Sequence, residues 1–275
     1  PRSSSAASDV YKRQFQPLDT PAPPEGTSWS HNAIDRHIES KFNEKGLHGN
    51  PTASPRVLVR RAWFDLLGIP PTPEEVTHWT ARLSEDTDPE TPINRMAYTE
   101  MLDTLLDQPQ YGERWARHWM DVARFAESFG YEQDYNRPNA YHYRDFLIRA
   151  FNQDLPFDQF VRWQIAGDEL APENPLALMA TGFLGAGVFP TQLTEAEFES
   201  ARYDELDDMV STTGVAFLGL SIGCARCHDH KFDPITAEDY YRFAANFTTT
   251  IRAEVKLDLN PDENQKKRKL SLIHI

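Results

Sequence analysis

Two cysteines, Cys224 and Cys227, are the only ones in this chain, and the second is followed directly by His228. This C-x-x-C-H spacing is the attachment signature of a c-type haem, in which two thiols add to the porphyrin vinyl groups and the next imidazole becomes an axial iron ligand. Two intervening residues let both sulfurs reach neighbouring vinyls while the chain turns the imidazole under the metal. The three residues are therefore predicted to hold haem c.

Two other chemistries fit the same residues. A C-x-x-C pair can be a dithiol or disulfide redox site, although that chemistry usually follows a strand and opens a helix in a βαβ setting, which this sequence lacks. Cys224 and Cys227 with His228 and His230 could instead hold zinc, because four thiolate and imidazole ligands close a structural zinc site. Short motifs are permissive, so haem, zinc and a bare dithiol stay open.

Further candidate ligands lie on both sides of the motif. All methionines precede Cys224 in the sequence, and Met209 is the candidate for the second axial ligand of the iron, although its position is more typical of a core residue on an amphipathic helix. His230 is too close to His228 to reach the opposite face of the same iron. With Asp233 it could ligate a different metal or act as an acid or base. Alternatively, the two belong to a hydrogen-bonded loop in which Asp233 caps a turn.

The composition is that of an acidic globular protein. The chain has 275 residues, of which 40% are hydrophobic, and its formal net charge is -14. Such a charge repels phosphate, which argues against nucleic acid and anionic membrane surfaces as partners and favours a cationic redox partner. No segment approaches the roughly 20 apolar residues of a membrane helix, since the longest candidate covers only residues 215–222.

The two ends of the chain differ in character from the rest. Residues 1–14 and 270–275 resemble translated sequencing-adaptor read-through and are excluded from fold reasoning. Residues 15–28 form a proline-rich linker, and residues 256–269 are expected to be a charged loop or the start of missing sequence. A single helical domain over residues 29–255 is predicted between them.

Hydrophobic spacing predicts an all-α, multi-helix fold with long functional loops. The loops are expected around residues 130–140, 166–175, 184–194 and 223–236. Helices are predicted over residues 31–45, 56–67, 93–106, 111–129, 139–151, 157–165, 194 to about 220, and 236–247, with another one opened by a capping box at Thr72 and Glu75.

Several of these helices have a face of apolar or of charged side chains. Ile34 and Ile38 begin a stripe expected to face the core, and Trp115, Trp119 and Val122 share one face of the helix predicted over 111–129. On the same helix, side chains of alternating charge follow at i, i+4 and i+7, which is more typical of an ion-pair ladder than of a catalytic site: Arg117, Asp121 and Arg124.

Three long stretches carry a resemblance to a known family. They cover residues 111–131, 143–170 and 204–235, the last containing C-A-R-C-H. Residues from about 34 to 255 resemble the planctomycete cytochrome c-like family. The resemblance implies a secreted or periplasmic bacterial protein, usually part of a larger chain with further domains; the biochemical activity of this family is not established.

Three hypotheses follow. The first is an extracytoplasmic electron-transfer module in which Cys224 and Cys227 attach haem and His228 is the proximal ligand. The second is an enzyme that uses an open iron or another metal near His228, His230 and Asp233. The third is a structural domain stabilised by zinc.

Overall fold

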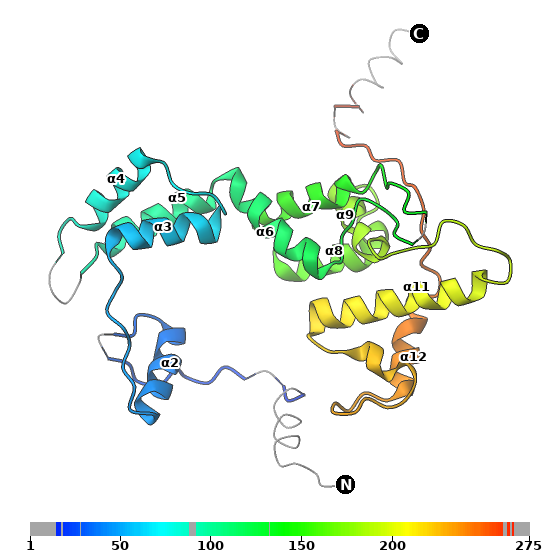
Figure 1. Cartoon of the computed structure of the whole chain (residues 1–275), viewed down its shortest axis with the longest axis horizontal. Coiled ribbons are helices and arrows are strands. Elements are labelled where there is room, and N and C mark those ends of the chain that lie inside the picture. Colours follow the sequence, from blue (N-terminus) through cyan, green and yellow to red (C-terminus); the bar gives the residue numbers. More distant parts are fainter. Residues whose placement is uncertain are drawn as a thin grey trace. The chain divides into compact units, whose positions relative to one another are not determined.

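A computed structural model describes residues 15–17, 19–27, 29–87, 92–131, 133–260, 263, 264 and 266. The predicted artefact segments at both ends, 1–14 and 270–275, lie outside these residues. Within them the secondary structure is helical, and the one extended feature is an isolated antiparallel bridge between Ser128 and Asn136 (Figure 1). The predicted all-α class is confirmed. In this part of the chain no helix is long and apolar enough to cross a membrane.

The chain divides into two compact units, and each is described by itself. The first contains the described residues up to Trp63 and those from Pro70 to Leu102; the second contains Phe64–Ile69 and the described residues from Asp103 onward. The boundaries of the single domain predicted over 29–255 stay a prediction.

The first unit contains α2 (Ala33–Glu44), α4 (Pro73–Leu83) and most of α3 (Pro55–Leu66) and α5 (Arg95–Leu106). The capping box at the start of α4 forms as predicted. The stripe predicted on α2 is wrong as a core face, because Ile34 is 71% and Ile38 42% exposed, whereas the buried residue of this helix is Glu39. Amphipathic spacing shows that a helix has an apolar face, not that another element covers it.

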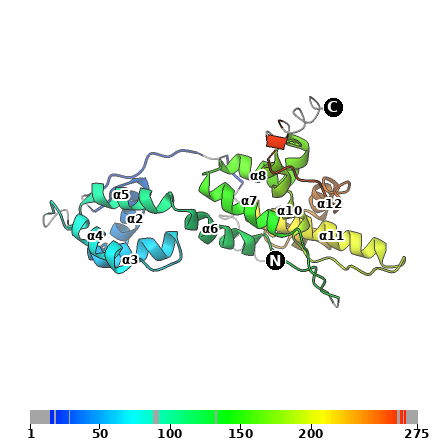
Figure 2. The same ribbon diagram turned by 90° about the horizontal axis from the view of Figure 1, so that it is seen from above.

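The second unit begins with the end of α5 and continues through α6 (Pro109–Val122), α7 (Tyr141–Asn152), α8 (Phe157–Leu170), α9 (Pro175–Ala180) and α10 (Gly182–Gly185). Helices α6 and α7 pack closely because α6 presents Gly112 and Ala116 to its neighbour. A Cβ atom on Gly112 would lie 2.4 Å from the carbonyl oxygen of Ile148. Figure 2 shows α7, α8 and α10 together in this unit.

Helix α6 is shorter than the sequence predicts, and it buries a different face. It ends at Val122 rather than near 129, and both Trp115 and Val122 are exposed. The chain leaves the helix at Arg124, which has a positive φ of 51° and directs its side chain to Asp208 of α11. The predicted ladder is therefore replaced by an ion pair across the fold.

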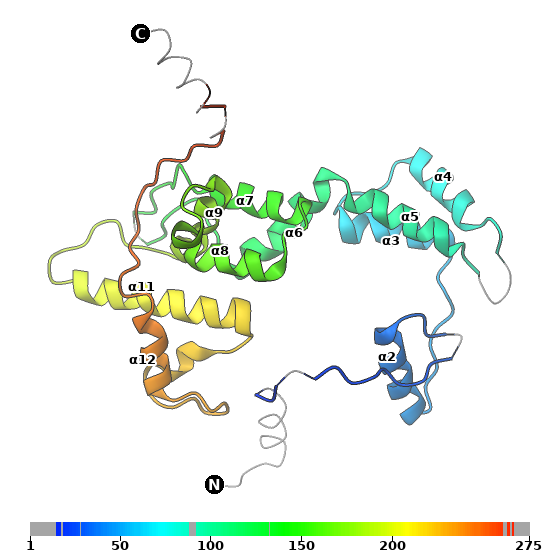
Figure 3. The same cartoon turned by 180° about the vertical axis from the view of Figure 1, so that it is seen from behind.

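The last part of the second unit carries the C-x-x-C-H motif. It consists of α11 (Phe198–Thr213), the π-helix η1 (Gly214–Leu218), the 3-10 helix η2 (Ile222–Arg226) and α12 (Ala237–Ala245). The helix predicted from 194 begins later, because Thr194 and Glu197 form a separate turn before it. Helices α11, α12 and η2 contact one another, and α11 and α12 lie side by side in Figures 1 and 3.

Candidate functional site

The C-x-x-C-H motif lies on a short turn against α11. The π-helix η1 ends at Gly219, whose φ of 65° reverses the chain, and η2 then begins at Ile222. A Cβ atom on Gly223 would lie 2.2 Å from the Ser211 Oγ atom, so only glycine lets η2 approach α11 this closely. π-Helical turns occur often at functional sites.

The two cysteines point away from the core on this turn. Ile222 and Ala225 of η2 are buried, whereas Cys224 and Cys227 are exposed and their thiols are free. The Cys224 N–H donates to the carbonyl oxygen of Ser221 at 3.1 Å, which fixes the start of the turn. Burial of the intervening apolar residues thus presents both sulfurs to solvent.

His228 is exposed, and a backbone hydrogen bond fixes the tautomer of its ring. Its Nδ1 atom lies 2.8 Å from the carbonyl oxygen of Asp229. A carbonyl oxygen only accepts hydrogen bonds, so Nδ1 carries a proton, and Nε2 is the ring nitrogen that has the lone pair when the ring is neutral. Histidines that ligate metals are oriented in this way by a bond from the other ring nitrogen.

His230 lies in a different environment from His228. Its side chain is 5% exposed. Its Nδ1 atom accepts the N–H groups of Phe232 at 3.2 Å and Asp233 at 2.9 Å, and its Nε2 atom lies 3.0 Å from the Ser221 Oγ atom. The Asp233 carboxylate is 3.5 Å from Nδ1, a charge contact only for a protonated ring. Because Nδ1 accepts two N–H groups, it carries no hydrogen in this arrangement, and Nε2 is the nitrogen that can donate to Ser221.

Arg226, between the two cysteines, ties the motif to the neighbouring helices. Its guanidinium group lies 3.0 Å from Asp204 and 3.2 Å from Asp207 of α11. Its backbone carbonyl oxygen accepts the Tyr241 hydroxyl at 3.1 Å, and Tyr240 donates to Asp207. The hydrogen bond that Arg226 donates to Asp204 raises the pKa of Arg226. Burial, followed by the bond to Asp207, raises the pKa of Tyr240.

The other predicted ligand lies in the protein interior. Met209 is 1% exposed and belongs to the hydrophobic core of the second unit, together with Leu206 and Val210. Across the described residues, no group of three or more histidine, cysteine, aspartate or glutamate side chains is arranged to hold a metal ion. The structure brings Cys224, Cys227 and His228 together on one turn.

The residues of this turn fit the donor set of a c-type haem. The thiols of Cys224 and Cys227 are free and accessible, and the Nε2 atom of His228 is available as a ligand. Two exposed aromatic side chains lie near the motif: Phe232 follows it closely in the sequence, and the Tyr241 hydroxyl donates to the Arg226 carbonyl oxygen within it. Apolar rings of this kind suit contact with a porphyrin.

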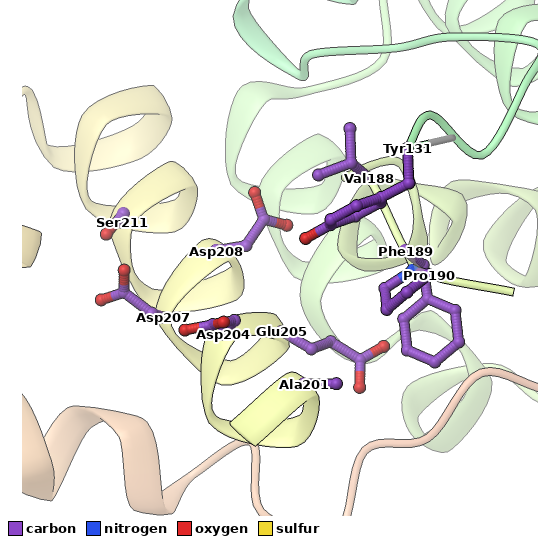
Figure 4. A pocket seen from close by; sticks show the side chains of 10 residues that line it. All are labelled: Tyr131, Val188, Phe189, Pro190, Ala201, Asp204, Glu205, Asp207, Asp208 and Ser211. Atoms are coloured by element: carbon purple, nitrogen blue, oxygen red, sulfur yellow. The ribbon is translucent and has the colours of Figure 1, made fainter. Parts of the chain in front are cut away.

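A cavity of about 350 Å³ lies beside α11. Its walls are Tyr131 and residues 188–190 on one side and α11 on the other (Figure 4). Four carboxylates of α11 line it, and all are paired with arginines: Asp204 and Asp207 with Arg226, Asp208 with Arg124, and Glu205 with Arg202 and Arg252. The cavity therefore offers no unpaired carboxylate to a cation.

The family of the chain follows from a match that includes the motif. The model of PSCyt2, a protein family of unknown function (DUF1549), matches residues 33–252. The chain belongs to this family. PSCyt2 is a planctomycete cytochrome c-related domain, in agreement with the resemblance found in the sequence. No curated protein and no solved structure matches the chain.

Two sets of residues in this PSCyt2 chain were missed by the sequence analysis. One is the contact of Arg226 with α11, for which the acidic run over 204–208 is the available signal. The other is the arginine cluster around the segment 183–189, in which Arg124, Arg137 and Arg252 donate to backbone carbonyl oxygens. Its members are far apart in the sequence, so no local pattern indicates it.

Proposed function

We propose that the chain is an extracytoplasmic c-type cytochrome-like module that carries covalent haem and transfers electrons. The observation that carries this proposal is the state of the motif: two free, exposed thiols share a turn with an imidazole whose Nδ1–H is bound to a carbonyl oxygen. A zinc site or a catalytic metal site would need further ligands, and the described residues provide no such group.

Each residue of the motif has a distinct part. Cys224 and Cys227 would hold the haem through thioether bonds, and His228 would provide its Nε2 atom as the proximal ligand. When bound, haem supplies reversible one-electron chemistry. The exposed position of the motif suits electron exchange with another protein, and the net charge of -14 favours a cationic partner. Haem is attached to cysteines outside the bacterial cytoplasmic membrane, which supports an extracytoplasmic location.

The test is a pyridine haemochrome spectrum of the full chain after export and maturation in a cytochrome c-competent host. We expect about one haem per chain that stays bound through denaturation, and its complete loss in the double variant Cys224→Ala, Cys227→Ala. The helical circular dichroism should be retained in this variant, because both thiols are exposed. Metal analysis is run on the same samples. Zinc at one equivalent without covalent haem in the wild type would overturn the proposal.

A further inference from the structure

His230 occupies a position from which it closes the motif into a loop. Its ring joins two points of the chain on opposite sides of the motif: Ser221 before it and Phe232 and Asp233 after it. The backbone strengthens the closure, because the His230 N–H donates to the carbonyl oxygen of Ile235 at 2.8 Å. Residues 221–235 are called the motif loop below.

The closure acts directly on the haem-attachment residues. Ser221, which faces the Nε2 atom of His230, also accepts the Cys224 N–H through its carbonyl oxygen. On the other side, Asp229, whose carbonyl oxygen orients the His228 ring, is the residue immediately before His230. One buried imidazole therefore fixes the chain next to the first thiol and next to the proximal histidine.

We propose that His230 is a positioning residue for haem attachment, and that it acts by holding the motif loop closed rather than by binding a metal. This inference rests on the proposed function for its effect on haem. The ring is suited to the task because it offers an acceptor on one side and a donor on the other at a fixed separation. With the lone pair of Nδ1 occupied by two N–H groups and Nε2–H directed to Ser221, neither nitrogen is left for iron or zinc.

Two substitutions test the Nδ1 side and the Nε2 side of the His230 ring separately. In His230→Asn the Oδ1 atom replaces Nδ1 as the acceptor for Phe232 and Asp233, but the side chain is too short to reach Ser221. In His230→Gln the longer side chain retains a donor for Ser221 and removes the acceptor. The matched control is His118→Gln, which changes an exposed histidine on α6 that has no part in the motif loop.

The first measurement is independent of haem. In unmatured protein, amide hydrogen exchange at Phe232 and Asp233 should be about tenfold faster in His230→Gln, because each amide loses its acceptor, and close to wild type in His230→Asn and in the control. Wild-type exchange rates at both amides in His230→Gln would overturn the proposed loop closure.

The second measurement is made on matured protein, as covalent haem per chain and as the midpoint potential of the haem that is attached. We expect His230→Gln to lose several-fold in haem per chain and to shift the potential, with His230→Asn recovering most of both. Wild-type yield and potential in His230→Gln would refute the positioning role. Loss of an axial ligand from the visible spectrum in both variants would also refute it, since it would identify His230 as a ligand.

The two proposals fail in different ways. If wild-type protein carries no covalent haem, the proposed function is wrong, yet the amide exchange still decides whether His230 closes the loop. If wild-type protein carries haem and the His230 variants match it in yield and potential, only the positioning role is wrong.

Discussion

Two segments of the second unit, 183–189 and the motif loop, combine a short helical turn with irregular chain, and side chains hold them in place in opposite ways. The segment 183–189 is fixed by arginines, whose guanidinium groups donate to the carbonyl oxygens of Phe183, Gly185, Ala186 and Gly187. The motif loop is fixed by the imidazole of His230 and by Arg226. The first is charge-rich and partly buried, and the second leaves its reactive groups exposed.

The two segments differ in the interactions that stabilise them. Burial, followed by the charges of Arg252 and Arg124, lowers the pKa of Arg137 to about 10, and Asp208 and Glu205 compensate the charge of the cluster through their ion pairs with Arg124 and Arg252. In the motif loop, His230 acts through single hydrogen bonds, and Arg226 forms ion pairs that are partly open to solvent. The arginine-held segment thus depends on complete ion pairs, whereas the motif loop depends on single hydrogen bonds that can be changed one at a time.

The largest effect is expected where a charge loses its partner. Arg124→Ala leaves the Asp208 carboxylate without its ion-pair partner and removes one of the two donors to the Phe183 carbonyl oxygen, which keeps the Ala186 N–H. We expect the free energy of unfolding to fall by about 2 to 4 kcal/mol, below the value for a fully buried pair because both side chains are about one quarter exposed. Urea unfolding measures it, and Arg124→Ala in an Asp208→Asn background should cost clearly less.

A matched variant separates the effect of the lost side chain on stability from the effect of the backbone conformation at Arg124. Arg124 has a positive φ, which glycine adopts without strain, so Arg124→Gly should be more stable than Arg124→Ala by about 1 kcal/mol. If both variants unfold at the wild-type urea midpoint, the arginine cluster does not stabilise the segment and the comparison fails.

An intermediate effect is expected for the ion pairs of the motif loop. Arg226→Ala removes contacts to Asp204 and Asp207, but the arginine side chain is 36% exposed and Asp204 is 61% exposed. The expected loss is about 0.5 to 1 kcal/mol in urea unfolding at low salt, and it should shrink as salt is added. Arg242→Ala, which breaks an exposed pair with Glu238, is the control and should change stability by less. A loss larger than that of Arg124→Ala would reverse the comparison.

The smallest effect concerns the cap that follows the motif loop. The Thr236 hydroxyl and N–H donate to Asp239 and lower the pKa of its carboxyl below the usual 3.8. A folded-state pKa below the unfolded value stabilises the protein at neutral pH, and this contribution is lost as the pH falls through the folded value.

Thr236→Ala should therefore lower the free energy of unfolding by less than Arg226→Ala does near pH 7, and by still less near pH 2. Urea unfolding at the two pH values measures the difference. Thr248→Ala is the control, because its hydroxyl donates to a carbonyl oxygen and its effect should not depend on pH in this range. An equal cost of Thr236→Ala at both pH values would contradict the assigned role of the cap.

Features that depend on neighbouring residues could be predicted from the sequence. The capping boxes at Thr72 and Thr236 form because donor and acceptor are three residues apart. The end of α6 before Arg124 could not be predicted, since the ion-pair partner of Arg124 is Asp208, 84 residues away. The exposure of Ile34 likewise depends on which element lies over α2, and spacing along one helix contains no such information.

In the candidate site, too, some features could be predicted from neighbouring residues and others could not. Cys224, Cys227 and His228 are recognised from their types and spacing alone. The role proposed for His230 is not, because a histidine two residues after a candidate ligand is compatible with a metal site, an acid or base, and a loop contact. Only the directions of its two ring nitrogens distinguish these, and they depend on how the chain folds back from Asp233 to Ser221.

The contacts that close the motif loop also impose an order of events in time. His230, Ile235 and Tyr241 all follow Cys227 in the sequence, so both thiols leave the ribosome, and any export channel, before the residues that fix their geometry. The cysteines are therefore presented first on an open chain and later on a closed turn.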